Sequence, residues 1–322
     1  MIALLFYLSA SSINILQHEE KAFVSWMRST NQYYTGDEYY LRLGIYLSNK
    51  RLVQEHNSNK ANTFRLTLNK FAAMTPSELK TYNGLLTTSE PQKAERIAKR
   101  KTTHNGESLD YREKGVVNEI RDQGECAACW AFAIIQSVES AYALKHTTLY
   151  ELSEQNLIDC VLDCKGCQGG YIPQTYVYVM NYQDGQFNLR DDYPFLGGEE
   201  ACHFEKRTKS PAQLVSYKTA ITGDEDQVKE FVEQYGPVAA GLNGSQIQFY
   251  LYESGIFNIR ACTPYPLSHG VGIVGYGVEG DSPYWILRNT WGKSWGEAGY
   301  CRMIRGYNMC GCAQMVSIPV LE

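Results

Sequence analysis

No apolar run in this chain of 322 residues is long enough to cross a lipid bilayer, because a membrane helix needs about 20 consecutive apolar residues. Basic residues are also in deficit: 30 Lys and Arg face 35 Asp and Glu, which gives a formal net charge of −5. Binding to phosphate backbones requires a clustered excess of positive charge. The composition therefore argues against a membrane protein and against nucleic acid as the main partner.

Cysteine is absent from residues 18–100, although the whole chain contains ten. No Lys or Arg precedes the first apolar segment, Ala3 to Leu8, which is too short for a membrane helix but suits the apolar region of a signal peptide. The small residues at 9–12 then supply a cleavage point. The alternative is a buried N-terminal segment. Export favours disulfides over free thiols among the later cysteines.

Three widely separated residues have the chemistry of a nucleophile, a base and an orienting amide. Cys129 precedes an aromatic residue, His269 follows it by 140 positions (269 − 129) and Asn289 by 160 (289 − 129). A thiol is mostly protonated at neutral pH, so a nucleophilic cysteine needs a neighbouring cation or a helix N-terminus to favour the thiolate. We expect Cys129 to begin a helix. We also expect His269 to hold the proton of the Cys129 thiol as an imidazolium. The Cys129 thiolate then attacks a peptide carbonyl and forms a thioester. Water hydrolyses this thioester.

Two further residues fit this scheme. Gln123, six positions before the nucleophile, can donate a side-chain N–H to the developing oxyanion beside the backbone N–H of Cys129. Trp291 can shield the bond between His269 and Asn289 from water.

Residues 18–100 contain a second pattern, a polar and aromatic stripe at spacings of three and four that predicts one face of a helix. Its members are Glu38, Arg42, Tyr46, Asn49, Val53 and Asn57. A short segment, Thr67 to Ala73, follows and carries Asn69 and Phe71.

These motifs together resemble the papain-like cysteine peptidases of the cathepsin L group. The segment from Cys126 to Trp130 matches the C-G-[SA]-C-[WY] signature of that family, with Ala127 in place of Gly. The helical stripe resembles the E-R-F-N-I-N pattern of their propeptides. Residues 67–73 resemble the G-x-N-x-F-x-D strand, with Ala73 in place of Asp, which puts in doubt a pH trigger acting through that carboxylate.

The resemblance implies an α+β fold with a mostly helical left domain, an antiparallel, barrel-like right domain and the active-site cleft between them. A mostly helical inhibitory propeptide precedes the two domains. We expect a signal peptide over 1–12, a propeptide over 13–105 that ends in a cleavable linker, and a mature peptidase over 106–322 that begins near His104 to Ser108.

The resemblance also implies disulfide pairs and a free nucleophile. The implied pairs are Cys126 with Cys167, Cys160 with Cys202, and Cys262 with Cys310. Of the remaining cysteines, Cys301 and Cys312 are hypothesised to form a fourth bridge, and Cys164 is left over.

The resemblance also implies a substrate-binding cleft, with residues carried over position by position. In it, a glycine-rich turn that contains Gly169 and Gly170 lies along the substrate backbone. The pocket for P2, the second substrate residue before the cleaved bond, is uncharged and favours a hydrophobic side chain. Its expected lining is Tyr171, Ile172, Gly241, Leu267, Gly270 and Met315, with Trp291 beside it.

Three positions carry narrower expectations. Ala127 is expected to strain the backbone if its φ is positive and to restrict the P1 residue next to the cleaved bond. Ser268 stands where relatives carry Asp or Asn, which alters the alkaline limb of activity. Asn243 begins the sequon N-G-S, read either as an exposed glycosylation site or as a polar turn.

The function implied is a cysteine endopeptidase made as a zymogen, without cofactor or metal. Its expected partners are peptide substrates, its own propeptide and cystatin-like inhibitors. We expect a monomer in a lysosome-like compartment or outside the cell. The alternatives are a zinc module on Cys160, Cys164 and Cys167, a silent relative that only binds, and another Cys–His acyl-transfer enzyme such as a transglutaminase.

Overall fold

The computed structural model describes residues 17–87 and 108–322. The expected signal peptide and most of the linker before the mature domain lie outside these residues. Residues 17–29 are helical. The other α-helices are α2 (Gly36–Ser58), α3 (Pro76–Thr81), α4 (Cys129–His146), α5 (Glu154–Cys160), α6 (Ile172–Tyr182), α7 (Glu225–Tyr235) and α8 (Ile247–Tyr250), with 3-10 turns at Gly166–Gln168, Phe204–Lys206 and Met309–Gly311.

The strands of the described residues form one strongly bent sheet in the order β1-β6-β9-β8-β7-β5-β10-β4-β3, and β2 adds to β7. Neighbours are antiparallel except β6 and β9, which are parallel. The strands are β1 (Phe64–Leu66), β2 (Leu109–Asp110), β3 (Gln186–Asn188), β4 (Lys209–Thr219), β5 (Val238–Leu242), β6 (Tyr252–Phe257), β7 (His269–Glu279), β8 (Ser282–Arg288), β9 (Tyr300–Ile304) and β10 (Met315–Leu321).

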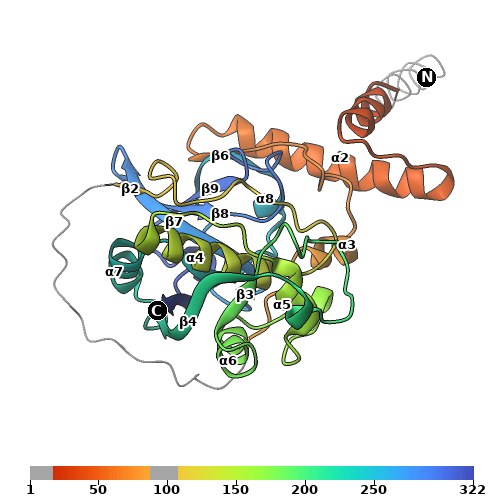
Figure 1. Cartoon of the computed structure of the whole chain (residues 1–322). Coiled ribbons are helices and arrows are strands. Elements are labelled where there is room, and N and C mark those ends of the chain that lie inside the picture. Colours follow the sequence, from red (N-terminus) through yellow and green to blue (C-terminus); the bar gives the residue numbers. More distant parts are fainter. Residues whose placement is uncertain (1–16, 88–107) are drawn as a thin grey trace, which may run out of the picture.

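Two hydrophobic cores divide residues 108–322 into two lobes. The left-lobe core surrounds α4, whose residues from Cys129 to Ser140 are all buried, as expected for a helix that is largely apolar around its circumference. The right-lobe core lies among strands β5 to β9, with Trp285 and Trp295 at its centre. The predicted α+β, two-lobed architecture with a helical propeptide is confirmed, and Figure 1 shows α4 running between the two lobes.

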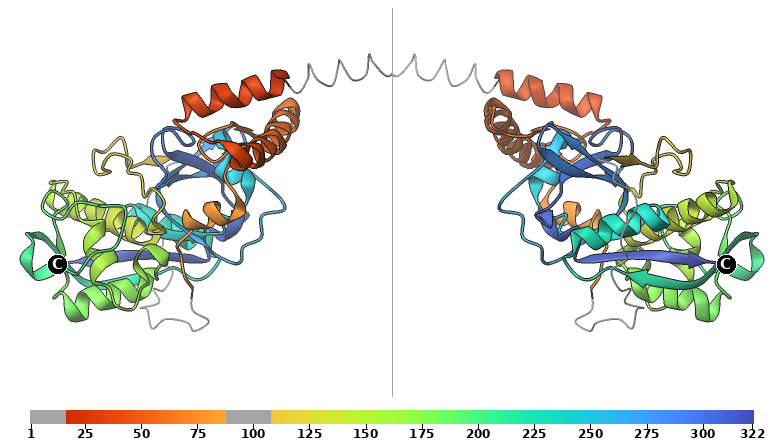
Figure 2. Two further views of the ribbon diagram at one scale, coloured as in Figure 1. Left: turned by 90° about the vertical axis from the view of Figure 1, so that its right-hand side faces the viewer. Right: turned by 90° about the vertical axis from the view of Figure 1, so that its left-hand side faces the viewer.

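The described hydrophobic residues of the propeptide are continuous with the right-lobe core. Strand β1 pairs with β6, so the propeptide extends the peptidase sheet. The ring of Phe64 packs 4.9 Å from Phe257, and full burial of one such side chain contributes roughly 1.5–3 kcal/mol. Figures 1 and 2 show the orange helix α2 alongside the blue right-lobe strands and away from the green left-lobe helices.

The stripe of polar residues on α2 faces the rest of the propeptide. The side chain of Asn49 donates to the carbonyl of Ala72 at 2.9 Å. Asn57 donates to the carbonyl of Leu66 at 2.7 Å and accepts from the N–H of the same residue at 3.0 Å. These amides bond backbone groups of Leu66 and Ala72, so the stripe fixes the path of the chain after α2.

Residues 67–69 have no regular structure and residues 70–73 form a turn, so the strand expected over 67–73 is wrong in position: the strand is β1, over 64–66. The reason is Asn69, whose side chain accepts from the N–H of Phe71 at 3.0 Å and whose carbonyl accepts from Ala72 at 3.0 Å. A side chain that bonds its own backbone two residues on favours a turn over a strand.

Ala73 has no carboxylate, and only its backbone carbonyl accepts from Arg42, at 3.1 Å. The carboxylates that pair with Arg42 therefore lie outside residues 67–73. The guanidinium pairs with Glu38 at 3.0 Å and with both carboxylate oxygens of Glu78. Glu78 also closes a capping box with Thr75 at the start of α3. The Arg42 guanidinium holds the pKa of Glu78 at about 2, so this pair stays ionised at any moderately acidic pH.

The three disulfides implied by the family resemblance are bonded, each with a Cα–Cα distance between 4.5 and 5.0 Å. The hypothesised bridge between Cys301 and Cys312 is wrong, because both are buried free thiols. The zinc alternative loses two of its three thiolates, since Cys160 and Cys167 are held in disulfides. Among residues 17–87 and 108–322, no helix has the length and apolar character of a membrane span.

Replacing Glu78 by Gln tests the Arg42 pair, because Gln keeps one oxygen for the capping box but removes the charge and replaces one of the two acceptors of the guanidinium by an N–H donor. In the full-length chain carrying Cys129→Ala, we expect the amides of α3 to lose about five-fold protection from hydrogen exchange, which corresponds to roughly 1 kcal/mol for a half-exposed ion pair. Glu205→Gln, which breaks the exposed pair with Lys209, is the matched control. Equal protection in both variants would show that the pair does not hold α3.

Candidate active site

Cys129 begins α4, where its sulfur lies at the positive end of the helix dipole. The preceding residue, Ala128, has no side chain that caps the helix, so the first N–H groups are left for other acceptors. Across the cleft, a Cβ on Gly270 would lie 2.9 Å from the carbonyl oxygen of Cys129. Glycine at this position therefore lets the start of β7, which carries His269, approach the start of α4.

The hydrogen bonds of Asn289 fix the tautomer of His269. The backbone N–H of Thr290 donates to Asn289 Oδ1 at 2.8 Å, which identifies this atom as an acceptor. His269 Nε2 lies 2.7 Å from the same oxygen and must therefore carry the proton. Neutral His269 then has an unprotonated Nδ1, a buried atom with no partner among the described residues. This nitrogen is the one available to accept the thiol proton.

Aromatic rings cover the His269–Asn289 pair. The indole of Trp291 lies 4.6 Å from the imidazole, centroid to centroid, and Tyr250 stacks on Trp291 at 5.1 Å. All these groups are buried. Exclusion of water strengthens the hydrogen bond that orients the imidazole.

Gln123 is fixed by the segment that follows Asn289. Its backbone N–H donates to the carbonyl of Thr290 at 2.8 Å, and its Oε1 accepts from the Thr290 hydroxyl at 2.5 Å. The side-chain Nε2 therefore faces the cleft, where it donates to the carbonyl of Cys126 at 2.8 Å. The structure thus brings together Gln123, Cys129, His269, Asn289 and Trp291.

The chain after α3 passes directly over the nucleophile. The N–H of Gly84 donates to Cys129 Sγ at 3.2 Å. The carbonyl of Gly84 accepts from Gly170 at 2.9 Å, and the N–H of Leu86 donates to the Gly170 carbonyl at 2.9 Å. The glycine-rich turn therefore pairs with an extended backbone, as expected for a substrate wall, and the occupant here is the propeptide.

Leu85 fills the pocket expected to take the P2 side chain. A Cβ on Gly241 would lie 2.5 Å from Leu85 Cδ2, and Leu267 and Met315 line the same space at 3.4 and 3.6 Å from that Cβ. Ile172, fully buried, belongs to the same hydrophobic cluster. Tyr171 is only partly buried and bonds Cys164 Sγ through its N–H at 3.3 Å, and Gly169 faces Gly84.

Tyr82, Gly84 and Leu85 are the functional residues that the sequence did not single out. The carbonyl of Tyr82 accepts from Gln123 Nε2 at 3.5 Å and from Trp291 Nε1 at 3.4 Å. The only local signal is a glycine within a short apolar segment between a helix and a polar linker. That signal lacks periodicity, so it does not distinguish an inhibitory segment from an ordinary loop.

Burial under the propeptide keeps the nucleophile and base in their neutral forms. Desolvation raises the pKa of Cys129 to about 11, against which the N–H groups of Gly270 and Gly84 act. Desolvation lowers the pKa of His269 to about 4, opposed by the hydrogen bond to Asn289. The ion pair expected from the sequence is therefore disfavoured in the covered state.

Two narrower expectations change. Ala127 does not have a positive φ, so the expected backbone strain is absent. Asn243 is only 3% exposed and its Nδ2 donates to the carbonyl of Thr263 at 3.1 Å, so it is not an exposed glycan acceptor. Ser268 directly precedes His269, and its hydroxyl accepts from the N–H of Gly244 at 3.2 Å.

Comparison with known families matches residues 105–320 to the papain family of cysteine proteases. The chain belongs to the papain family of cysteine proteases. Residues 23–79 match the cathepsin propeptide inhibitor domain (I29), so this papain-family chain is a zymogen that carries its own propeptide as inhibitor.

Similar proteins span most of the chain. A cathepsin L-like proteinase of Phaedon cochleariae is 36% identical over 87% of each chain. Pro-cathepsin H of Mus musculus is 34% identical over 94% of this chain and 91% of its own. The digestive procathepsin L2 proteinase from the larval midgut of Tenebrio molitor superposes with a TM-score of 0.87 at 28% identity, over 94% of this papain-family chain and 100% of its own.

Gly84→Ala tests the close approach over the nucleophile, since the added Cβ would lie 1.7 Å from the Ala127 carbonyl oxygen. We expect the propeptide to dock more weakly by about five-fold or more, because forced overpacking costs roughly 1–3 kcal/mol. In full-length zymogen at neutral pH, Cys129 should then be alkylated correspondingly faster. Gly44→Ala, in open space on α2, is the control, and equal rates in the two variants would contradict the contact.

In the Cys129→Ala zymogen, where His269 has no thiolate partner, acid should weaken propeptide docking through His269. Its pKa in the covered state, about 4, lies below the ordinary value of 6.5, so the covered state binds fewer protons. The docking energy linked to His269 is therefore fully present above about pH 6.5 and is lost as pH falls toward 4. Burial also lowers the pKa of His56, on α2, which acts in the same direction.

The measurement is hydrogen exchange at Leu85 and Leu86 in Cys129→Ala zymogen between pH 7 and 4, corrected for intrinsic rates. Protection should decline with falling pH, and the decline should be smaller when His269→Gln is added. An identical decline with and without His269 would assign the acid sensitivity to other groups.

Proposed function

We propose that the mature protein is a cathepsin L-like cysteine endopeptidase that acts through a Cys129 thiolate and a His269 imidazolium. The observation that carries the proposal is the tautomer of His269, whose Nδ1 has no partner among the described residues. The next residue, Gly270, lies against the start of the helix that bears Cys129. Removal of the propeptide rehydrates both groups and removes the desolvation that favours their neutral forms. The helix dipole then stabilises the thiolate.

Each residue of the site has a defined step. The Cys129 thiolate attacks the peptide carbonyl and forms a tetrahedral oxyanion, which Gln123 Nε2 and the backbone N–H of Cys129 stabilise. His269 gives its proton to the departing amine, which leaves a thioester. Water, deprotonated by His269, then attacks the thioester and releases the acid and the free thiol. Asn289 holds the imidazole throughout, under Trp291.

The substrate preference follows from the occupant of the cleft. Leu85 lies in an uncharged pocket formed by Gly241, Leu267 and Met315, which supports a hydrophobic P2 residue. The methyl of Ala127 lies against Gly84, since a Cβ on Gly84 would be 2.9 Å from it, and this supports a restricted choice of residue next to the cleaved bond.

The remaining assignments extend the family membership. We assign residues 1–12 to a signal peptide, 13–105 to the propeptide and 106–322 to the mature enzyme. The protein enters the secretory pathway and acts as a monomer in a lysosome-like compartment or outside the cell. Cystatin-like proteins are the expected class of external inhibitor.

The direct test is hydrolysis of an internally quenched peptide, blocked at both ends, by protein trimmed with an aspartic peptidase. Blocked ends restrict the assay to endopeptidase activity. We expect Cys129→Ala and His269→Ala to abolish hydrolysis, and Asn289→Ala to lower kcat by more than about ten-fold through loss of orientation. Hydrolysis that survives Cys129→Ala in the trimmed protein would refute the mechanism.

A peptide library tests the two specificity assignments. Gly241→Val should lower kcat/KM for Phe or Leu at P2 by about ten-fold or more relative to Ala at P2, because the valine methyls occupy the space that Leu85 fills. Ala127→Gly should broaden the P1 profile. Gly198→Val, in open space on the left lobe, is the matched control. An unchanged P2 profile in Gly241→Val would place the pocket elsewhere.

A further inference from the structure

The four catalytic groups come from segments on both sides of the cleft, so their geometry depends on how the lobes are held together. Cys129 belongs to α4 of the left lobe, whereas His269 begins β7 and Asn289 directly follows β8 in the right lobe. A shift of about 1 Å between reacting groups can cost 100-fold in rate. The contacts between α4 and β8 are therefore functionally important.

A buried guanidinium lies at this junction. Arg288 is the last residue of β8 and directly precedes Asn289, and only 5% of it is exposed. Its Nη1 donates to Gln136 Oε1 at 3.1 Å. Its Nη2 donates to the backbone carbonyls of Asn118 at 3.1 Å and Glu119 at 2.6 Å. One side chain thus joins β8 to α4 and to the segment that leads to Gln123.

Gln136 occupies the other side of the junction. It lies seven residues, about two helical turns, after Cys129 on α4 and is 3% exposed. A Cβ on Gly272 would be 1.8 Å from Gln136 Nε2, so β7 approaches the amide closely, three residues after His269. The Arg288–Gln136 contact therefore lies where the segments bearing Cys129, His269 and Asn289 converge.

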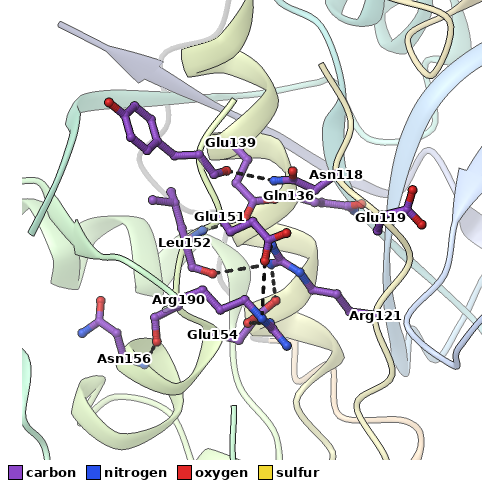
Figure 3. Close-up of polar contacts among 12 residues, drawn as sticks. Asn118, Glu119, Arg121, Gln136, Glu139, Glu151, Leu152, Glu154, Asn156 and Arg190 are labelled. Carbon is purple, nitrogen blue, oxygen red and sulfur yellow. Dashed lines mark hydrogen bonds and ion pairs between the residues drawn. The ribbon is translucent and has the colours of Figure 1, made fainter. Parts of the chain in front are cut away.

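The segment carrying Gln123 is anchored to the same cluster. Arg121 pairs with the buried Glu139 of α4 at 2.8 Å and also with Glu154 of α5. Figure 3 shows Asn118, Arg121, Gln136 and Glu139 gathered beside α4, with Glu154 and Arg190 at the outer end of the cluster. Arg190 contacts Glu151 and Glu154 within the left lobe.

No carboxylate lies within ion-pair distance of Arg288 in the described part of the chain, so its acceptors are neutral oxygens. The groups that face it electrostatically are Glu139, Glu154, Arg121 and Tyr300. A buried cation held by neutral acceptors adds little net stability compared with an apolar side chain. Its directional bonds specify the relative position of three chain segments.

We propose that Arg288 and Gln136 are positioning residues that hold Asn289 and Gln123 in register with the helix that carries Cys129. This inference rests on the proposed function. It assigns to the pair no contact with substrate and no proton transfer.

The test compares Arg288→Met, Gln136→Met and Arg190→Met, made as full-length chains and trimmed with an aspartic peptidase. Arg190→Met makes the same chemical change at the outer end of the cluster, away from β8. We expect Arg288→Met to lower kcat by about ten-fold or more with KM within about two-fold, the pattern of misplaced reacting groups. Gln136→Met should show a smaller loss of the same kind, and Arg190→Met none.

A second measurement is the pH dependence of Cys129 alkylation by iodoacetamide. A loss of stability alone does not change this dependence. We expect Arg288→Met to lose part of the reactivity below pH 7, and Arg288→Lys to restore part of it, because Lys retains a donor for the carbonyls. If Arg288→Met does not fold, the kcat and alkylation profile of Gln136→Met test the inference. Met nearly conserves the volume of Gln and removes the hydrogen bond to Arg288.

Folded Arg288→Met and Gln136→Met with wild-type kcat and alkylation profiles would overturn the inference. So would an equal loss in Arg190→Met, which would show general destabilisation of the cluster. Failure of the proposed function gives a different result: wild-type trimmed protein would then show neither peptide hydrolysis nor a reactive thiol at Cys129.

Discussion

The hydrogen bond between His269 Nε2 and Asn289 Oδ1 is the interaction on which the site depends. Because Thr290 identifies the oxygen as an acceptor, the bond determines which ring nitrogen carries a proton and leaves Nδ1 free. The stacked rings of Trp291 and Tyr250 keep water from this bond. Without it, a histidine near a thiol would have neither a defined tautomer nor a defined orientation.

The propeptide inhibits this site in two physical ways. It fills the cleft, with the Gly84 N–H on the sulfur and Leu85 in the apolar pocket. It also excludes water, and the resulting desolvation favours thiol and neutral imidazole over the ion pair. The propeptide can be held in this way because its hydrophobic residues are part of the right-lobe core and its strand β1 is part of the sheet. Inhibition is thus coupled to folding.

The parts of the account that sequence could predict are those with strong local signals. A cysteine at the start of an apolar, alanine-containing segment predicted the start of α4, and the stripe of polar residues predicted one face of α2. The signals failed where tertiary packing decides. Asn243 has an exposed-turn sequence but is buried by contact with Thr263, and Asn69 replaces an expected strand with a turn. The pairing of Arg42 with Glu78 joins residues 36 positions apart and left no local pattern.

The most direct measurement is the rate of Cys129 alkylation by a neutral reagent as a function of pH, in trimmed enzyme and in full-length zymogen. The account predicts that trimmed enzyme reacts fast across a plateau that begins several pH units below the ordinary cysteine pKa of about 8.5, that this plateau disappears with His269→Ala, and that the zymogen reacts slowly throughout. A trimmed enzyme whose reactivity rises only near pH 8.5, with or without His269, would contradict the account.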